Sequence, residues 1–325
     1  MDNPVNKNLL DKKMWKATRE GYGEALLELG NKNPNIVVLT ADLTESTRSQ
    51  AFKNKYPERF FQFGVAEQNM MSAAAGMSLC GLIPFVSTYG VFSAGRCWDQ
   101  LRVSVCYSNC NVKIEGAHAG LMVGPDGASH QALEDLTLTS VLPNLTVISP
   151  VDSIEAKKAT VAAANIKSPV YLRLSREPTP ILTDESTPFK IGKANIIKNG
   201  KDVAVIATGS LVFLSLIAAR ELEGENISVC VINMQTIKPL DKKLLIKTAK
   251  KTGAIVTAEE HQIHGGLGSA VTEVLAQKFP VPVEMIGVRD SFGESGETWE
   301  LMKHFGLDVK SIKRAIKKVL KNKKL

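Results

Sequence analysis

The sequence has no apolar run of the roughly 18 to 20 residues that a membrane-spanning helix needs. Residues 1–13 are polar and lack the apolar centre of a secretion signal. The five cysteines are odd in number and include no Cys-x-x-Cys pair, which favours reduced thiols. These absences predict a cytoplasmic protein that does not associate with a membrane.

A metal site is not indicated either. Zinc ligation by Cys106, Cys110 and His118 is conceivable. However, His118 and His130 lack the short spacing on one face that histidine ligands of a metal usually have. We predict no metal site formed by this chain.

The net charge of +7 suggests a nucleic-acid partner, but the distribution of the charge argues against one. Residues 310–325 contain eight Lys or Arg and no acid, so the charge of +7 falls to −1 without this segment. Val309, Ile312, Ile316 and Leu320 recur at helical spacing, which predicts a last helix with a solvated basic face. An acidic partner or RNA is the alternative, although no aromatic platform supports it. We therefore predict no nucleic-acid partner.

Short β-branched segments alternate with segments of helical period, a rhythm typical of βαβ units and a parallel sheet. The first predicted strands are Ile36–Leu39, Phe60–Phe63, Pro84–Ser87, Val112–Glu115, Leu145–Ser149 and Val170–Leu174. The helices predicted between them are Met14–Leu29, Ala66–Cys80, Phe92–Tyr107, Ala132–Val141 and Ile154–Asn165. A second series of strands comprises Val203–Ala207, Ile227–Asn233, Ala254–Thr257 and Val283–Gly287. We predict an α/β fold of two doubly wound domains, residues 1–180 and 201–325, joined by a linker at 181–200.

Ligands of open parallel sheets bind beyond the carboxyl ends of the strands. Five of the six strands in the first series are followed by polar or aromatic side chains, namely Asp42, Glu67, Tyr89 with Phe92, His118 with Asp126 and His130, and Arg176. This grouping favours an enzyme over a binding module, although surface loops are polar in most proteins.

Two of these segments are unusual. Glu67 opens an otherwise apolar helix, where a capping role is ordinary, but the small residues of that helix would also admit a flat ligand or another backbone. The loop from Gly116 to Gln131 combines several glycines with His118, Asp126 and His130. Such a loop suits recognition of a hydroxylated substrate, with histidine also transferring protons.

Together these segments resemble the C-terminal half of transketolases. The resemblance runs from about Lys16 to the end of the chain. It is carried by A-T-R-E at 17–20, A-D-L-T-E-S at 41–46, F-G-V-A-E-Q-N-M at 63–70, I-P-F-V-S-T-Y at 83–89, W-D-Q-L-R at 98–102, the His118–His130 loop, L-S-R at 174–176, T-G-S at 208–210 and E-E-H-x-x-x-G-G-L-G at 259–268. It implies a transferase of pentose phosphate metabolism that uses thiamine diphosphate to move a two-carbon ketol unit from a ketose phosphate to an aldose phosphate.

The resemblance also implies roles at the cofactor. Glu67 matches the glutamate that shares a proton with the ring nitrogen of the aminopyrimidine, and so acts in catalysis as well as binding. Tyr89 and Phe92 fall where the family stacks aromatic rings around the pyrimidine. Tyr89 replaces the commoner Phe, and the segment from Phe92 to Arg96 needs a one-residue shift. Asp42 lies at the acidic position of the cofactor pocket.

On the substrate side, the resemblance implies that His118 and His130 bind the C1 hydroxyl and carbonyl region of the donor and take part in catalysis. Asp126 matches the acid that reads a sugar hydroxyl. Arginine suits phosphate because its planar fork binds phosphate bidentately. The phosphate-binding positions of the family correspond to Arg19, Ser46 and Arg176. Pro125, where the family often has Glu, could alter pairing with a partner chain.

The Gly-Asp-Gly segment with which transketolases hold diphosphate and Mg²⁺ does not occur in this sequence. We therefore expect a separate N-terminal subunit to carry that site, with thiamine diphosphate across the interface and Mg²⁺ bound mainly by the partner. Self-association of such pairs would give an α2β2 heterotetramer. A fragment of a full-length enzyme is the alternative.

Two other functions are compatible with the sequence. The β subunit of a 2-oxo acid dehydrogenase decarboxylase has the same architecture, but a small oxo acid needs neither a sugar-reading loop nor a phosphate-binding set. A non-catalytic scaffolding subunit would not need Glu67. His261 and His264 are predicted to be structural.

Overall fold

The structure, a computed structural model, describes residues 11–323. Its strands are β1 (Ile36–Thr40), β2 (Phe60–Gln62), β3 (Ile83–Tyr89), β4 (Lys113–Ala117), β5 (Thr146–Ile148), β6 (Val170–Arg173), β7 (Asn195–Lys198), β8 (Val203–Ala207), β9 (Val229–Asn233), β10 (Thr236–Lys238), β11 (Ile255–Gln262) and β12 (Val283–Val288). Its α-helices are α1 (Thr18–Lys32), α2 (Gln50–Lys55), α3 (Glu67–Leu79), α4 (Trp98–Gln100), α5 (Asp135–Ser140), α6 (Ser153–Ala164), α7 (Leu211–Glu223), α8 (Lys242–Thr252), α9 (Leu267–Lys278), α10 (Thr298–His304) and α11 (Val309–Lys321).

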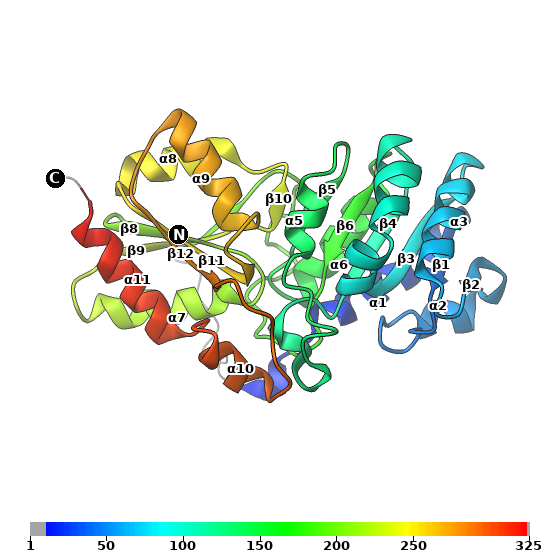
Figure 1. Cartoon of the computed structure of the whole chain (residues 1–325), viewed down its shortest axis with the longest axis horizontal. Helices are drawn as coiled ribbons and strands as arrows, with labels where there is room; N and C mark the ends of the chain where they lie inside the picture. Colours follow the sequence, from blue (N-terminus) through cyan, green and yellow to red (C-terminus); the bar gives the residue numbers. More distant parts are fainter. Residues whose placement is uncertain (1–10, 324–325) are drawn as a thin grey trace.

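The strands form two mostly parallel sheets flanked by helices, which confirms the predicted α/β class (Figure 1). The seven-stranded sheet has the order β10-β5-β6-β4-β3-β1-β2, and the five-stranded sheet has the order β12-β11-β8-β9-β7. Two strands were not predicted. β10 comes from the second half of the chain and pairs antiparallel with β5 of the first sheet. β7 lies within the expected linker and pairs antiparallel with β9.

The pairing of β3 with β4 determines where the candidate site lies. The two strands are parallel and in register, so that Tyr89 at the end of β3 lies opposite Ala117 at the end of β4. Residue 118 therefore begins the loop that leaves the sheet beside Tyr89.

The segment predicted as one helix over Phe92–Tyr107 is in fact broken. It consists of a π-helix η3 (Val91–Arg96), the short α4, and a second π-helix η4 (Leu101–Tyr107). The Cys97 N–H donates to the Phe92 carbonyl at 3.3 Å, five residues earlier. A π-turn holds one more residue than an α-turn, so this segment is wound more widely than the predicted helix.

Helices α1 and α6 pack closely over one face of the first sheet. Gly21 of α1 makes this approach possible, because a Cβ at that position would lie 1.9 Å from the Ser153 carbonyl oxygen of α6. The largest apolar cluster is shared by both sheets; it joins Val147 of β5 and Ile237 of β10 to Ile206 of β8. The two halves of the chain are therefore packed together and not merely tethered.

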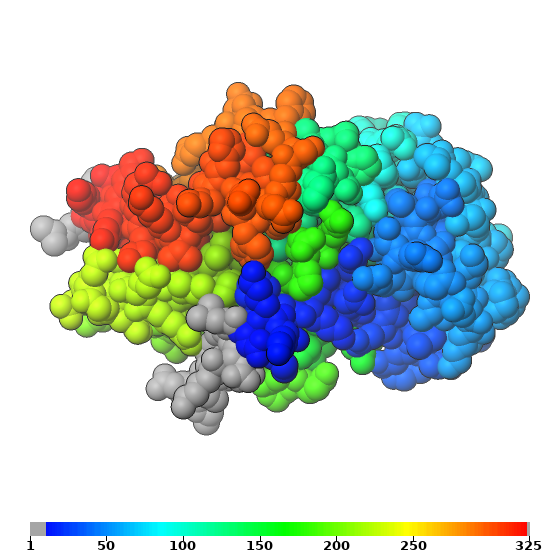
Figure 2. Space-filling view, turned by 90° about the horizontal axis from the view of Figure 1, so that it is seen from below, coloured from blue at the N-terminus to red at the C-terminus, as the bar shows by residue number. Residues whose placement is uncertain are grey.

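The junction between the halves also includes the first described residues. Lys16 forms an isolated antiparallel bridge with Thr179. The Trp15 ring packs edge-on against Phe213 of α7 and Trp299 of α10, at centroid distances of 5.9 and 5.8 Å. Figure 2 shows this N-terminal segment, in dark blue, lying where the two halves meet.

The predicted last helix is confirmed as α11. Asp308 caps it by accepting a hydrogen bond from the Ser311 N–H at 2.8 Å. Ile312, Ile316 and Val319 are buried on its inner face. Among residues 11–323, no helix is long and apolar enough to cross a membrane.

We expect Gly21→Ala to lower the free energy of unfolding by about 1–3 kcal/mol, because the added methyl group must push α1 away from α6. Gly76→Ala is the matched control, since Gly76 also lies inside a helix but a Cβ there would meet no atom within 4 Å. The control should be neutral or more stable by up to about 1 kcal/mol. Urea unfolding followed by circular dichroism measures both; equal midpoints for the two variants would contradict the close packing.

Candidate active site

Glu67 occupies the first position of α3, where backbone N–H groups and the helix dipole favour a carboxylate. Its side chain is only 2% exposed. Both carboxylate oxygens accept hydrogen bonds from Nη1 of Arg96, each at 3.0 Å. Glu67 is thus a buried carboxylate whose ion-pair partner, among the described residues, is Arg96 of η3.

A series of stacked aromatic rings begins next to this ion pair. The Arg96 guanidinium lies over the Phe92 ring, 4.3 Å from its centroid. Phe92 stacks on Tyr89 with centroids 5.9 Å apart and an interplanar angle of 14°. Tyr89 in turn stacks on His118 at 4.1 Å. The His130 ring meets both Tyr89 and Phe92 edge-on, so four rings form one wall.

His118 is 3% exposed and has a left-handed backbone conformation with φ of 52°. Its Nε2 lies 2.7 Å from Nη1 of Arg19. Since a guanidinium can only donate, Nε2 accepts and the imidazole proton resides on Nδ1. The Nδ1 atom is buried and has no hydrogen-bond partner among the described residues. Burial, followed by the positive charge of Arg19, lowers the pKa of His118 from 6.5 to about 3, so the ring is neutral at physiological pH.

Three arginines, Arg19, Arg48 and Arg176, place positive charge near His118, and we refer to them as the arginine cluster. Arg19 donates to the Ser46 carbonyl at 2.9 Å. Burial lowers the pKa of Arg19, and the neighbouring charges of Arg48 and Arg176 lower it further. The Nε atom of Arg19 is buried without a hydrogen-bond partner in the described chain. A cationic group with an unused donor can bind an anion such as phosphate.

Arg176 reaches this cluster from the segment after β6. Its Nη1 donates to the Val123 carbonyl at 2.5 Å and lies 3.7 Å from a carboxylate oxygen of Asp126. Asp126 is therefore linked to the arginine cluster but not directly to the aromatic wall.

The structure brings most of the predicted residues into one continuous set of contacts. This set comprises Glu67, Phe92, Tyr89, His130, His118, Arg19 and the Ser46 carbonyl, with Arg96 joining Glu67 to Phe92. Arg176 and Asp126 form a neighbouring pair, and the charge of Arg176 acts on Arg19 and His118. Asp42 is the exception. It is exposed after β1, with φ of 61°, and its N–H donates to Gln62. Within residues 11–323, no hydrogen bond or ring contact joins Asp42 to Glu67 or to the aromatic wall.

Three further residues belong to this region and were not predicted. Arg96 pairs with Glu67, and Arg48 adds charge near Arg19 while pairing with Glu20 at 2.7 Å. Glu115, on β4, is fully buried, and burial raises its pKa well above the usual value, only partly offset by Ser87 and Arg19. A signal for Glu115 was present, because an acid inside an apolar strand needs an explanation. No sequence signal pointed to Arg96 or Arg48, since a charged residue on a helix or loop is usually solvated.

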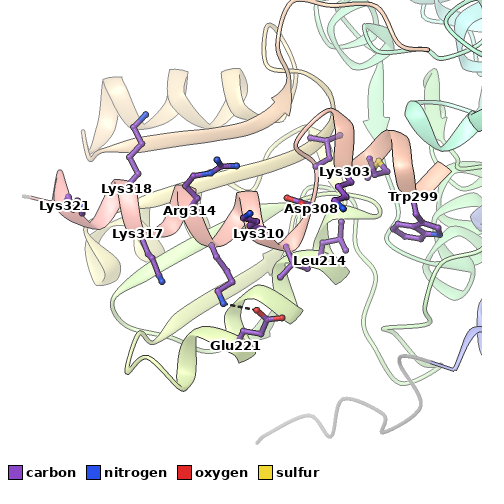
Figure 3. A pocket seen from close by; sticks show the side chains of 14 residues that line it. Leu214, Glu221, Trp299, Lys303, Asp308, Lys310, Arg314, Lys317, Lys318 and Lys321 are labelled. Atoms are coloured by element: carbon purple, nitrogen blue, oxygen red, sulfur yellow. Dashed lines mark hydrogen bonds and ion pairs between the residues drawn. The ribbon is translucent and has the colours of Figure 1, made fainter. Parts of the chain in front are cut away.

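A cavity of about 950 Å³ lies elsewhere, between α7, α10 and α11 of the second domain (Figure 3). It is lined by lysines, but Lys317 and Lys318 point to opposite sides of α11. Lys313 and Lys317 are paired with Glu221 and Glu225 respectively. Because these three lysines diverge or are already paired, they do not converge on an anion.

Comparisons with known proteins agree with this geometry. The family Transketolase, pyrimidine binding domain, matches residues 15–180, and the family Transketolase, C-terminal domain, matches residues 192–312. The 6-deoxy-6-sulfo-D-fructose transketolase subunit SqwH of Clostridium sp. (strain MSTE9) is 40% identical over 94% of this chain and 95% of its own length. A protein of Methanocaldococcus jannaschii, provisionally named a transketolase C-terminal section, is 44% identical over 95% of this chain and 98% of its own.

A solved structure described as a split gene transketolase, inactive beta4 tetramer, superposes with a TM-score of 0.89. It is 48% identical, covering 95% of this chain and 99% of the solved one. Full-length transketolases are matched over about half of their length, as for the human enzyme, which is 37% identical over 93% of this chain and 48% of its own.

The neutral state of His118 can be measured directly. His118 and His261 are both buried, and burial lowers their pKa values to about 3 and about 4. We expect both imidazoles to retain the NMR shifts of the neutral ring at pH 5.5, with assignments from the His118→Asn and His261→Asn variants. The unfolded chain takes up these protons below about pH 6.5, so the free energy of unfolding should fall as the pH drops from 6.5 toward 3. A His118 midpoint near 6.5 would contradict this description.

Proposed function

The chain belongs to the transketolase family, and on that premise we propose that it is the C-terminal subunit of a split transketolase that transfers a two-carbon ketol unit between sugar phosphates. The proposal is carried by one observation. A buried carboxylate, an aromatic wall and a cationic cluster lie in a single chain of contacts, from Glu67 through His118 to Arg19. These are the groups needed for a cofactor ring, a sugar carbonyl and a phosphate.

The residues present fit thiamine diphosphate. Glu67 offers a buried carboxylate for the pyrimidine ring nitrogen, and Tyr89 and Phe92 offer flat apolar surface for stacking. Asp42 would complete the pocket if its exposed loop faced the cofactor. When bound, the cofactor supplies a nucleophilic carbon for the donor carbonyl. Glu67 would hold and return the proton at the pyrimidine nitrogen, which requires that Arg96 share or release the carboxylate.

His118 would orient the donor sugar. Its Nδ1–H has no hydrogen-bond partner in the described chain, and we propose that it donates to a carbonyl or hydroxyl oxygen of the substrate. Arg19 fixes the tautomer by donating to the opposite nitrogen. His130 lies against the same aromatic rings and would contact the adjoining hydroxyl, and Asp126 would read a hydroxyl further along the sugar.

The cationic cluster would bind the anionic end of the sugar. Arg19 donates to the Ser46 carbonyl, and Arg176 and Arg48 add positive charge near it. Phosphate and sulfonate are both tetrahedral anions, and a relative of this chain is named for a sulfonated fructose. We propose a phosphate donor and treat the sulfonate as an outcome of the test below.

A partner subunit is part of the proposal. The chain lacks the Gly-Asp-Gly segment expected for diphosphate and Mg²⁺. Large apolar side chains are exposed next to Glu67 and along α3 and η4, including Val65 at 73%, Leu79 at 75% and Tyr107 at 85%. Exposed apolar surface of this kind is typical of protein contacts. An N-terminal transketolase subunit that covers Val65 and the start of α3 would bring the diphosphate and Mg²⁺ site against Glu67, and pairs would associate as an α2β2 assembly.

The first test is an assay of xylulose 5-phosphate with ribose 5-phosphate, with the chain alone and with an N-terminal-type subunit. We expect turnover only with both subunits, thiamine diphosphate and Mg²⁺. Glu67→Gln should lower kcat by about 10²–10⁴-fold, because the amide cannot exchange the proton. Glu58→Gln, at an exposed glutamate, is the control and should be indistinguishable from the parent chain.

Three outcomes would contradict the proposal in different ways. Turnover by the isolated chain would refute the split site. Decarboxylation of pyruvate without ketol transfer would indicate a 2-oxo acid enzyme. Full activity of the Glu67→Gln complex would indicate a scaffolding role for this chain.

A second test concerns the anion. We expect Arg176→Ala to raise the KM for the phosphorylated donor by about ten- to hundredfold, because a charge-assisted hydrogen bond is lost. Arg220→Ala, at an exposed arginine of α7, is the matched control. The same assay with 6-deoxy-6-sulfofructose distinguishes the two anions. An unchanged KM in Arg176→Ala for both donors would refute the anion-binding role.

A further inference from the structure

Two motifs of the second domain, T-G-S at 208–210 and E-E-H at 259–261, meet at Glu260 of β11, whose side chain is 4% exposed. Its Oε2 accepts a hydrogen bond from the Ser210 hydroxyl at 2.9 Å. Its Oε1 accepts a hydrogen bond from the backbone N–H of Met122 at 2.6 Å. Met122 belongs to the loop between His118 and His130, so this carboxylate joins the second domain to the predicted substrate loop.

Gly120 shows how closely the loop fits this carboxylate. Its φ is +82°, a conformation that favours glycine. A Cβ at Gly120 would lie 2.3 Å from Oε1 of Glu260. The loop can therefore approach the carboxylate only because this position has no side chain.

The other end of the loop is tied to the same residue through its main chain. Arg173 donates to the Glu260 carbonyl at 2.7 Å and to the Ala132 carbonyl at 3.3 Å. The Arg173 guanidinium is itself held by Asp135, in an ion pair of 3.0 Å with both side chains buried. Gly120 N–H also donates to the Ala132 carbonyl at 3.0 Å, which closes the loop.

We infer that Glu260 is a positioning residue that anchors the substrate loop, residues 118–131, and thereby sets where His118 and His130 meet the sugar. Its effect on sugar binding rests on the proposed function, whereas the anchoring itself does not. In the part of the chain that the structure describes, no contact joins Glu260 to the aromatic wall or to the arginine cluster, so its carboxylate reaches the site only through the loop backbone. The second domain, which contributes none of the predicted catalytic groups, thus determines the geometry of the substrate site.

Glu259, the preceding residue, is a matched control. It lies on the same strand and is 1% exposed. Its carboxylate accepts hydrogen bonds from the Leu267 and Gly268 N–H groups at 2.7 and 2.8 Å, and so caps α9 inside the second domain. A change at Glu259 alters the stability of the same strand without touching the loop.

The test compares Glu260→Ala, Glu260→Gln and Glu259→Ala. Hydrogen exchange of the Met122 amide is measured in the full chain, and the donor KM, kcat and thiamine diphosphate affinity are measured in the complex with the N-terminal-type subunit. We expect Glu260→Ala to accelerate Met122 exchange and to raise the donor KM by about ten- to hundredfold each, because a buried N–H loses its acceptor. Cofactor affinity should change less than threefold. Glu260→Gln retains an acceptor, so its Met122 exchange rate and donor KM should both lie within about threefold of the parent values. Glu259→Ala should lower the melting temperature without altering the exchange rate or the KM.

If Glu260→Ala does not fold, Ser210→Ala takes its place, because it removes one of the two contacts that hold the carboxylate and should produce a smaller change in the same direction. Unchanged Met122 exchange in the folded variants would overturn the inference. Equal acceleration of Met122 exchange in Glu259→Ala and Glu260→Ala would overturn the inference as well, since equal effects would indicate a general loss of stability. If Glu260→Ala accelerates Met122 exchange but the parent complex shows no ketol transfer, the anchoring of the loop is supported and the proposed function is refuted.

Discussion

The candidate site depends on the parallel, in-register pairing of β3 with β4. Parallel strands end at the same edge of a sheet, and the register places Tyr89 opposite Ala117. The next residue, His118, therefore stacks on Tyr89 at 4.1 Å. A slip of one residue would turn Tyr89 to the other face of the sheet and would separate the aromatic wall from the arginine cluster.

Burial determines the chemistry of the groups at this edge. His118 is neutral at physiological pH because it is removed from water and faces arginines, so its ring offers one hydrogen-bond donor and one acceptor and carries no charge. Glu67 is equally buried but has Arg96 beside it, which compensates the charge of the carboxylate. The two residues thus occupy similar depths and are suited to different tasks because their neighbours differ in charge.

The two domains contribute differently to the site. The first supplies every predicted catalytic and binding side chain, whereas the second supplies buried acceptors and close backbone contacts. Glu260 accepts a hydrogen bond from the Met122 N–H. Gly127 leaves room for Ser295, which precedes α10, and Gly124 leaves room for Thr298, the first residue of α10. Arg173 is bonded to both sides of the junction. The second domain, which holds none of the predicted catalytic groups, is thus packed directly against the loop.

The sequence by itself determined the α/β class, ten of the strands and the edge at which polar residues collect, because β-branched runs and helical periodicity are local signals. It also predicted most of the residues that the structure brings together at this edge, through motifs whose order and spacing resemble those of transketolases. Only the tertiary structure decided the rest. β10 is three residues long and pairs with a strand 88 positions earlier at Ile148, and Arg96 reaches Glu67 across 29 positions. Glu260 meets Met122 across 138 positions, and contacts of this range follow from packing, which no local pattern encodes.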